Sequence, residues 1–191
     1  APKILNKLEN VTVNDGELAQ FMIKSFGKPK PTVKWFKDEV EVVIDESVEI
    51  LEVEDEVTFI IKACRSVENM GAYTAKVTNE FGEVVSNKAT LTINRAPTFI
   101  KKPEDEIAIQ DKSVRFECIV DSLPKAKLTW TLNDKELTNK EAKFEIDAKT
   151  SAITLVLAKV TPAHLGKYVV TASNTVGEVS HTFNLDVLEP P

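Results

Sequence analysis

The side chains best suited to catalysis or metal binding are few and scattered in this sequence of 191 residues. Its only histidines are His164 and His181, and its only cysteines are Cys64 and Cys118. Their spacing matches no zinc-ligand pattern, and no glycine-rich loop is present to cradle a phosphate group. The sequence therefore predicts no enzyme, no metal and no cofactor. We expect His164 to be a polar turn residue and both cysteines to be small buried apolar groups.

A run of acids at residues 39–56 is the strongest local feature. It holds nine Asp or Glu residues and no Lys or Arg. A calcium loop needs ligands at fixed offsets around a tight glycine turn, whereas this run has no glycine and alternates with valines. We therefore expect short strands with one solvated, negative face. The alternative is a docking face for a basic partner, with Glu49, Glu52 and Glu54 as its candidate residues.

Charge and hydropathy argue against two classes of partner. The net charge is −6, whereas nucleic-acid binding requires a basic face for the phosphates. No apolar run approaches the ~18 residues of a membrane span. The sequence thus predicts neither nucleic acid nor a membrane as a partner. The lysines between Lys24 and Lys37 are expected to scatter over exposed loops, with a basic docking patch as the alternative.

The chain repeats itself once. Its only two tryptophans, Trp35 and Trp130, lie 95 residues apart. The same offset relates Phe21 to Phe116 and Pro29 to Pro124. Because a buried indole removes a large apolar area from water, we expect each tryptophan to centre one core. The repeat predicts two domains, residues 1–94 and residues 95–191.

The apolar pattern within each half predicts an all-β sandwich. Short alternating segments are separated by turn signals about every 8–12 residues, with almost no helical periodicity. The first strand of each half is expected to be broken in two, with Pro103 marking the break in the second half. Asn94 and Arg95 are expected to form a linker that restricts bending, because no Gly/Ser run separates the halves. Residues 188–191 resemble this junction, which suggests a longer array of the same unit.

Three motifs occur at equivalent positions in the two halves. They are a tryptophan near the end of a core strand, Gly-x-Tyr at 71–73 and 166–168, and Asn-x-x-Gly at 79–82 and 174–177. In combination they resemble the immunoglobulin fold, and the split first strand resembles its intermediate set. The resemblance implies two tandem immunoglobulin-like sandwiches, in which each tyrosine returns its hydroxyl to a nearby backbone group. The core residues it implies are Ile23, Trp35, Tyr73, Ala75, Cys118, Trp130, Tyr168 and Val170.

One departure from the family pattern bears on location. The resemblance places the usual disulfides at positions 23 with 75 and 118 with 170, where this chain has Ile23 with Ala75 and Cys118 with Val170. Neither bridge can form, which is typical of a reducing compartment. The pattern is similar to the intracellular immunoglobulin domains of the giant muscle proteins titin, twitchin, projectin and obscurin. The implied location is the cytoplasm, in the sarcomere or myofibril.

That resemblance also implies a function. We expect a structural, load-bearing segment of a sarcomeric filament protein, with a further role in docking proteins. Its partners would be neighbouring immunoglobulin-type domains of the same chain and other sarcomeric proteins, and a parent protein of this kind can carry a kinase domain elsewhere. If residues 11–13 pair in parallel with the last strand, end-to-end force would load that pairing in shear. The alternative is a dedicated protein–protein interaction module of a cytoskeletal or cell-adhesion immunoglobulin protein.

Overall fold

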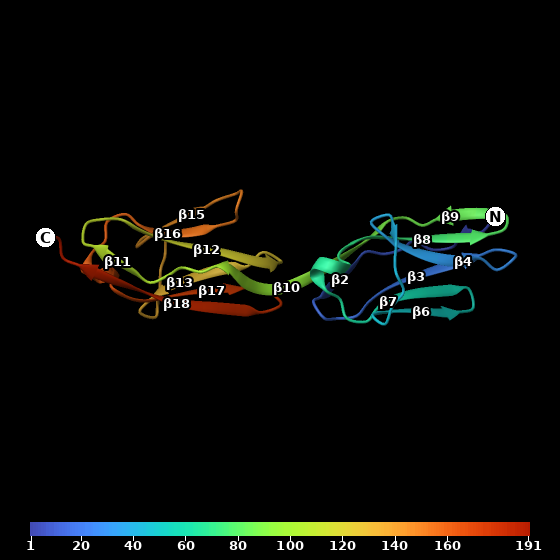
Figure 1. Ribbon diagram of the computed structural model, residues 1–191, viewed down its shortest axis with the longest axis horizontal. Helices are drawn as coiled ribbons and strands as arrows, with labels where there is room; N and C mark the ends of the chain where they lie inside the picture. Colours follow the sequence, from blue (N-terminus) through green and yellow to red (C-terminus); the bar gives the residue numbers. More distant parts are fainter. The chain divides into compact units, whose positions relative to one another are not determined.

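The computed structural model describes residues 1–191, which divide into two compact units, Ala1–Asn94 and Arg95–Pro191 (Figure 1). Each unit is a sandwich of two β-sheets, so the predicted all-β class is confirmed. Helix is confined to the four-residue α1 (Ser66–Asn69) and the 3-10 turn η1 (Pro162–His164). Neither has the length or the apolar character that a membrane crossing would need.

The strands of the first unit form two sheets. One has the order β1-β3-β7-β6, and the other has β10-β8-β4-β5 with β2 on β10 and β9 on β8. The strands are β1 (Lys3–Ile4), β2 (Val11–Asn14), β3 (Ala19–Phe26), β4 (Thr32–Lys37), β5 (Val40–Glu41), β6 (Val48–Val53), β7 (Glu56–Ile61), β8 (Gly71–Asn79), β9 (Gly82–Val85) and β10 (Ala89–Lys101), whose first residues belong to this unit.

The second unit repeats this plan. Its sheets have the orders β10-β12-β16-β15 and β11-β18-β17-β13-β14, and β17 and β18 run side by side in Figure 1. Its strands are the remainder of β10, then β11 (Glu106–Ile109), β12 (Val114–Leu123), β13 (Lys127–Leu132), β14 (Lys135–Glu136), β15 (Lys143–Ile146), β16 (Ile153–Leu157), β17 (Gly166–Ser173) and β18 (Glu178–Leu188).

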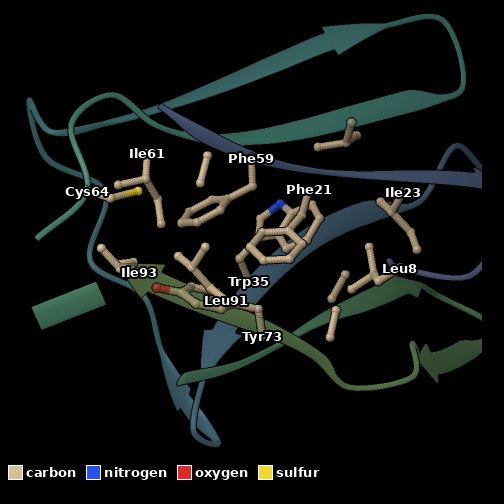
Figure 2. Packing of buried hydrophobic residues seen from close by; sticks show 14 residues of the cluster. Leu8, Phe21, Ile23, Trp35, Phe59, Ile61, Cys64, Tyr73, Leu91 and Ile93 are labelled. Carbon is tan, nitrogen blue, oxygen red and sulfur yellow. The ribbon is translucent and has the colours of Figure 1, made fainter. Parts of the chain in front are cut away.

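Strict alternation along the strands builds each core. In β3, every second side chain from Ala19 onward is buried and its neighbours face solvent, as a period of two on a sheet requires. Figure 2 shows the rings of Phe21, Trp35 and Phe59 gathered at the centre of the first core, with Cys64 towards one end. The Trp35 and Phe59 rings stack with their centroids 5.3 Å apart.

The second core places its aromatic rings differently. Phe59 of the first unit corresponds to Leu155 of the second unit. Phe59 pairs with a phenylalanine on β3, and Leu155 pairs with the equivalent phenylalanine on β12. Conversely Ala89, opposite Tyr73, corresponds to Phe183, opposite Tyr168. All four of these residues are buried. The two units therefore place this buried phenylalanine in different sheets, and the other position of the pair holds Ala89 in the first unit and Leu155 in the second.

The positions of the missing disulfides are filled by apolar packing. The side chains of Ile23, Ala75, Cys118 and Val170 are all at most 1% exposed. Cys64 and Cys118 are free thiols in different units. Burial raises the pKa of both, that of Cys118 to about 11. At neutral pH both sulfurs are therefore protonated and pack as apolar groups.

Truncating one tryptophan tests whether each unit folds around its own indole. Trp130→Ala should lower the free energy of unfolding of the second unit by about 3–5 kcal/mol, because it leaves a large cavity. Trp35 then becomes the only indole, so its fluorescence during urea unfolding reports on the first unit alone. We expect that transition to stay in place while circular dichroism shows an additional, earlier one. If fluorescence and circular dichroism instead showed one shared transition at a lower urea concentration, the two cores would not be independent.

Candidate functional site

The chain's histidines take structural roles. The His164 Nδ1 accepts a hydrogen bond from the Thr161 N–H at 2.9 Å, at the start of η1. Burial lowers the pKa of His164, which favours the neutral ring that can accept this bond. The His181 Nε2 lies 2.8 Å from the Pro103 carbonyl oxygen, and its ring stacks on Phe183. No three His, Cys, Asp or Glu residues gather where they could hold a metal ion.

A parallel pair of strands closes each unit. In the first unit, β2 pairs in parallel with β10 over four residues, from Val11 opposite Leu91 to Asn14 opposite Asn94. The Asp15 N–H extends this ladder by donating to the Asn94 carbonyl oxygen at 2.8 Å. The expected parallel pairing of residues 11–13 with the last strand is therefore present.

The second unit has the same arrangement. Strand β11 pairs in parallel with β18 over four residues, from Glu106 opposite Leu185 to Ile109 opposite Leu188. The Gln110 N–H then donates to the Leu188 carbonyl oxygen at 2.8 Å. In each unit, a strand near the start is thus bonded directly to the strand that ends the unit.

The first strand of each unit is broken because its halves serve different sheets. Strand β1 pairs antiparallel with β3 in one sheet, whereas β2 pairs with β10 in the other. In the second unit, the part of β10 from Arg95 to Lys101 pairs with β12, and β11 pairs with β18. Pro103 lies between these two segments, where the chain crosses from one sheet to the other.

The two Gly-x-Tyr motifs fix the ends of the core. The Tyr73 hydroxyl donates to the Asn69 carbonyl oxygen at 2.6 Å, and the Tyr168 hydroxyl to that of His164 at 2.5 Å, as predicted. Burial raises the pKa of both phenols, that of Tyr168 to about 12. Both hydroxyls therefore stay protonated and able to donate.

The glycine of this motif makes room for a turn residue that the sequence did not reveal. Gly166 has φ +144°, and a Cβ there would lie 2.3 Å from the Asn133 Oδ1. That oxygen accepts a hydrogen bond from the Lys167 N–H at 3.0 Å. In the first unit Asp38 takes the same place beside Gly71. Glycine is required because any side chain would displace the bond that joins the β13–β14 turn to β17.

The asparagines of the two Asn-x-x-Gly motifs hold hairpins through their side chains. Neither Asn79 nor Asn174 adopts a positive φ. Instead the Asn79 Oδ1 accepts from the Phe81 N–H, and its Nδ2 donates to the Pro29 carbonyl oxygen at 3.1 Å. Asn174 makes the equivalent bond to Pro124 at 3.0 Å. The side-chain amide, rather than backbone freedom, thus explains asparagine at these positions.

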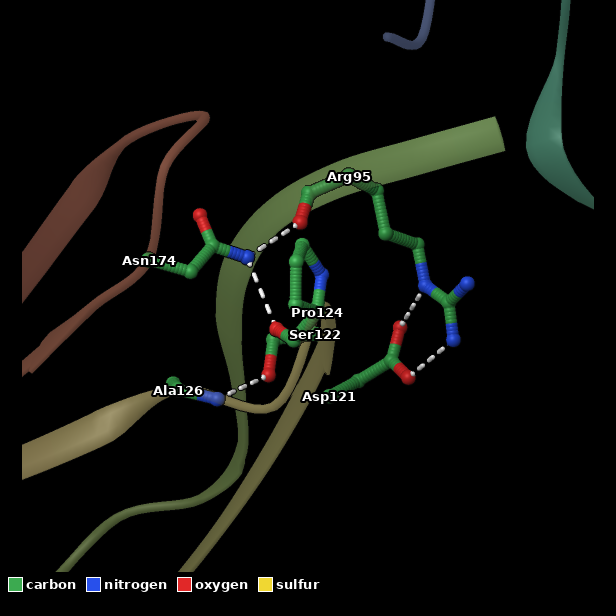
Figure 3. A network of polar contacts seen from close by, with 6 residues as sticks. All are labelled: Arg95, Asp121, Ser122, Pro124, Ala126 and Asn174. Atoms are coloured by element: carbon green, nitrogen blue, oxygen red, sulfur yellow. Dashed lines mark hydrogen bonds and ion pairs between the residues drawn. The ribbon is translucent and has the colours of Figure 1, made fainter. Parts of the chain in front are cut away.

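The two residues expected to form a linker are both paired. Asn94 lies opposite Asn14 within the first unit, and Arg95 lies opposite Leu123 within the second. The Arg95 guanidinium binds both carboxylate oxygens of Asp121, with its Nε at 2.9 Å and its Nη2 at 2.8 Å (Figure 3). This bidentate bond holds the pKa of Asp121 below its ordinary value.

Figure 3 shows a second set of bonds that fixes Arg95 to its own unit. The Asn174 Nδ2 donates both to the Arg95 carbonyl oxygen at 2.9 Å and to that of Pro124. The neighbouring turn is held by the Ala126 N–H, which donates to the Ser122 Oγ at 2.9 Å. Arg95 is therefore an integral part of the second sandwich.

The acidic run does not form the single negative face that the sequence suggested. Glu49 and Glu52 both lie in β6, but three positions apart they point to opposite sides of the sheet. Glu52 is on the same side as Val48 and Ile50, which pack against the core. Glu54 lies in the turn after β6, with φ +54°. The structure places these glutamates along one strand edge and its turn, and their docking role remains a prediction.

Together, two bridge-free sandwiches, each closed by a parallel strand pair and a tyrosine clamp, define a tandem of immunoglobulin-type domains. A family model for the immunoglobulin I-set domain matches residues 2–93 and again residues 97–187. The chain belongs to the immunoglobulin I-set family. This fold is generally non-catalytic, and as a class the chain is a structural or interaction module.

Individual proteins similar to this chain come from different settings. Human Roundabout homolog 2 is 30% identical over 165 residues, which are 86% of this chain and 11% of that protein. The Muscle M-line assembly protein unc-89 of Caenorhabditis elegans is 28% identical over 192 residues, or 98% of this chain and 2% of that protein. The chain thus spans a small fraction of these relatives.

A solved tandem from titin is also similar. The I-band fragment I67-I69 from titin superposes with a TM-score of 0.74 and 26% identity, covering 99% of this chain and 66% of that one. The resemblance to immunoglobulin tandems of titin-like muscle proteins, expected from the sequence, is therefore confirmed.

Replacing Gly166 tests the reason for the Gly-x-Tyr motif. Gly166→Ala should cost about 2–4 kcal/mol of unfolding free energy, from backbone strain at positive φ and from the displaced Asn133. Gly16, at φ +88° with open space around it, is the control, and Gly16→Ala should cost only about 1–2 kcal/mol. Urea denaturation measures both. If Asn133→Ala recovers none of the loss in Gly166→Ala, the proposed clash is wrong.

The Arg95–Asp121 pair should make stability depend on pH. The pKa of Asp121 is lower in the folded chain than its ordinary value of 3.8. The pair's contribution to the free energy of unfolding is therefore complete above pH 3.8. It is lost as the pH falls through the pKa of Asp121 in the folded chain. Asp121→Asn should destabilise the second unit by less than about 1 kcal/mol at pH 7, because the pair is partly exposed.

Urea titrations at pH 7 and pH 2 measure this difference, which should be smaller at the lower pH. Asp134→Asn, which removes the same charge from an exposed turn carboxylate, is the matched control. An equal penalty for Asp121→Asn at both pH values would contradict the assigned role.

Proposed function

We propose that the chain is a load-bearing segment of a sarcomeric filament protein, acting in the cytoplasm of muscle cells. Its neighbours would be further immunoglobulin-type domains of the same chain, and other sarcomeric proteins would bind along the array. The similarity to titin tandems and to a muscle M-line assembly protein supports this setting. The observation that carries the proposal is the parallel pairing of β2 with β10 and of β11 with β18.

Parallel pairing determines how a unit responds to force. A pull on the two ends of a unit draws the paired strands along each other in opposite directions. The ladder bonds lie across this direction, so they share the load and must break nearly together. The unit then resists until a threshold and unfolds as a whole. If the first and last strands were antiparallel, the two pulled ends would lie at the same end of the ladder. Its bonds would then open one at a time, at a lower force.

The ladder is supported from behind by the core. Val11 and Val13 of β2 pack against the buried cluster of the first unit, and Leu91 and Ile93 of β10 are fully buried. In the second unit, Ala108 and Leu185 occupy the equivalent inner positions. Shearing the ladder therefore also exposes apolar surface to water, which adds to the resistance.

A dedicated interaction module is the second candidate. It is favoured by the acids from Asp45 to Glu56, seven residues of which none forms an ion pair within the chain. These two functions are compatible, because the acids lie on β6, its flanking turns and the first residue of β7, and not on the parallel ladder.

Single-molecule stretching of the whole tandem tests the load-bearing proposal. We expect two discrete unfolding events, each lengthening the chain by about 30 nm, since an extended residue spans ~3.4–3.6 Å and each unit has close to a hundred residues. Gln110→Pro removes the N–H that donates to Leu188 and should lower the force of one event only. Gln110→Ala keeps that N–H and should leave both forces unchanged. Gradual extension without steps, or equal effects of the two substitutions, would refute the proposal.

A further inference from the structure

Strand β6 of the first unit is a long unpaired sheet edge. It lies at the end of the order β1-β3-β7-β6 and pairs only with β7, from Val48 opposite Ile61 to Val53 opposite Glu56. The Val48 N–H turns away from β7 and donates to the Asp45 carbonyl oxygen. Because an antiparallel ladder alternates, the N–H and C=O groups of Ile50 and Glu52 also face away from β7. They are available to another strand.

The charge along this edge is not neutralised. Glu49, Glu52 and Glu54 lie on the strand and its turn, Asp55 and Glu56 follow, and no ion pair within the chain involves any of them. The equivalent edge in the second unit is β15, where Glu145 is bonded to Arg115 and also pairs with Lys143 at 3.6 Å. The unbalanced negative edge is thus specific to the first unit.

The sheet surface beside β6 is apolar as well. Leu51 is 48% exposed, Val53 56% and Met22 40%, and all three lie on the outer face of this sheet. By strand register, Leu51 corresponds to Glu145, and Met22 to Glu117. In the second unit both of those glutamates form ion pairs. The first unit therefore exposes apolar side chains where the second has a charged, self-paired surface.

These features select one kind of occupant. Charges on an edge strand prevent pairing with an identical edge, because like charges face each other. Two copies of β6 would bring several glutamates together, so this edge does not pair with itself. A strand with Lys or Arg opposite Glu49 and Glu52 would gain opposite-charge pairs across the ladder. Apolar residues opposite Leu51 and Val53 would cover the exposed side chains.

We propose that β6 binds an extended, basic segment of a partner protein as an additional antiparallel strand. Backbone bonds to Ile50 and Glu52 provide the attachment. The preferred pattern in the partner segment runs from the residue opposite Val53 to the residue opposite Val48. It is apolar, basic, apolar, apolar, basic, apolar. This inference specifies the partner for the interaction role proposed above and does not depend on load bearing. Stretching and peptide binding can therefore fail separately.

The probe is a blocked octapeptide with the sequence Lys-Val-Lys-Val-Val-Lys-Val-Lys, titrated into the intact, nitrogen-15-labelled tandem. We expect amide shifts centred on Ile50 and Glu52, with affinity falling as salt rises. A peptide N-methylated at its third and fifth residues loses the N–H groups that face β6 and should not bind. A peptide N-methylated at its fourth and sixth residues has those groups free and should bind.

Charge reversal gives the matched control. Glu49→Lys combined with Glu52→Lys should weaken binding about tenfold or more, because two attractive cross-strand pairs become repulsive. Glu9→Lys combined with Glu80→Lys makes the same change in net charge at exposed sites away from β6 and should alter affinity less than about twofold. The proposal would be overturned by shifts centred on another strand edge or by equal binding of the two methylated peptides. Equal effects of the two charge reversals, or no binding at millimolar peptide, would also overturn it.

Discussion

Each unit depends on the bond between a strand near its beginning and the strand that ends it. This pairing is parallel, so β2 and β10, or β11 and β18, run in the same direction with the unit's two ends at opposite ends of the ladder. This pairing requires the first strand to cross from one sheet to the other. Strand β1 bonds to β3 in one sheet, and β2 then joins β10 in the other. The break in the first strand and the proposed response to force both follow from this one topology.

The ladder can hold only if the two sheets stay together, and here no disulfide joins them. Packing at Ile23, Ala75, Cys118 and Val170 takes over that task. The two cores are built from different residues, as the exchange of Phe59 and Ala89 for Leu155 and Phe183 shows. The surfaces differ more than the cores. One outer sheet face is covered by ion pairs, and the other exposes Leu51 and Met22 beside an unneutralised acidic edge.

The fold was predictable from the sequence because its signals repeat. Trp35 and Trp130, Tyr73 and Tyr168, and the strand alternation each occur twice in register, so a chance pattern was excluded. The bonds from polar side chains to distant backbone were not predictable, because the type and spacing of a residue such as Asn174 or Asp38 do not indicate which backbone group it meets in the fold. The bond between Arg95 and Asp121 was likewise not predictable, since the two residues are distant in sequence. A run of acids in sequence does not form one face in a strand, because the strand period of two sends Glu49 and Glu52 to opposite sides of the sheet.

The most direct test of the central claim is the direction dependence of the unfolding force of the second unit within the intact tandem. Handles on cysteines introduced at Lys102 and Glu189 pull β11 and β18 in shear, whereas handles at Lys112 and Glu189 peel them apart from one end. The natural thiols are buried and should not react with the handles. We expect a clearly higher threshold in shear than in peeling. Equal forces in the two directions would show that the parallel ladder does not bear the load.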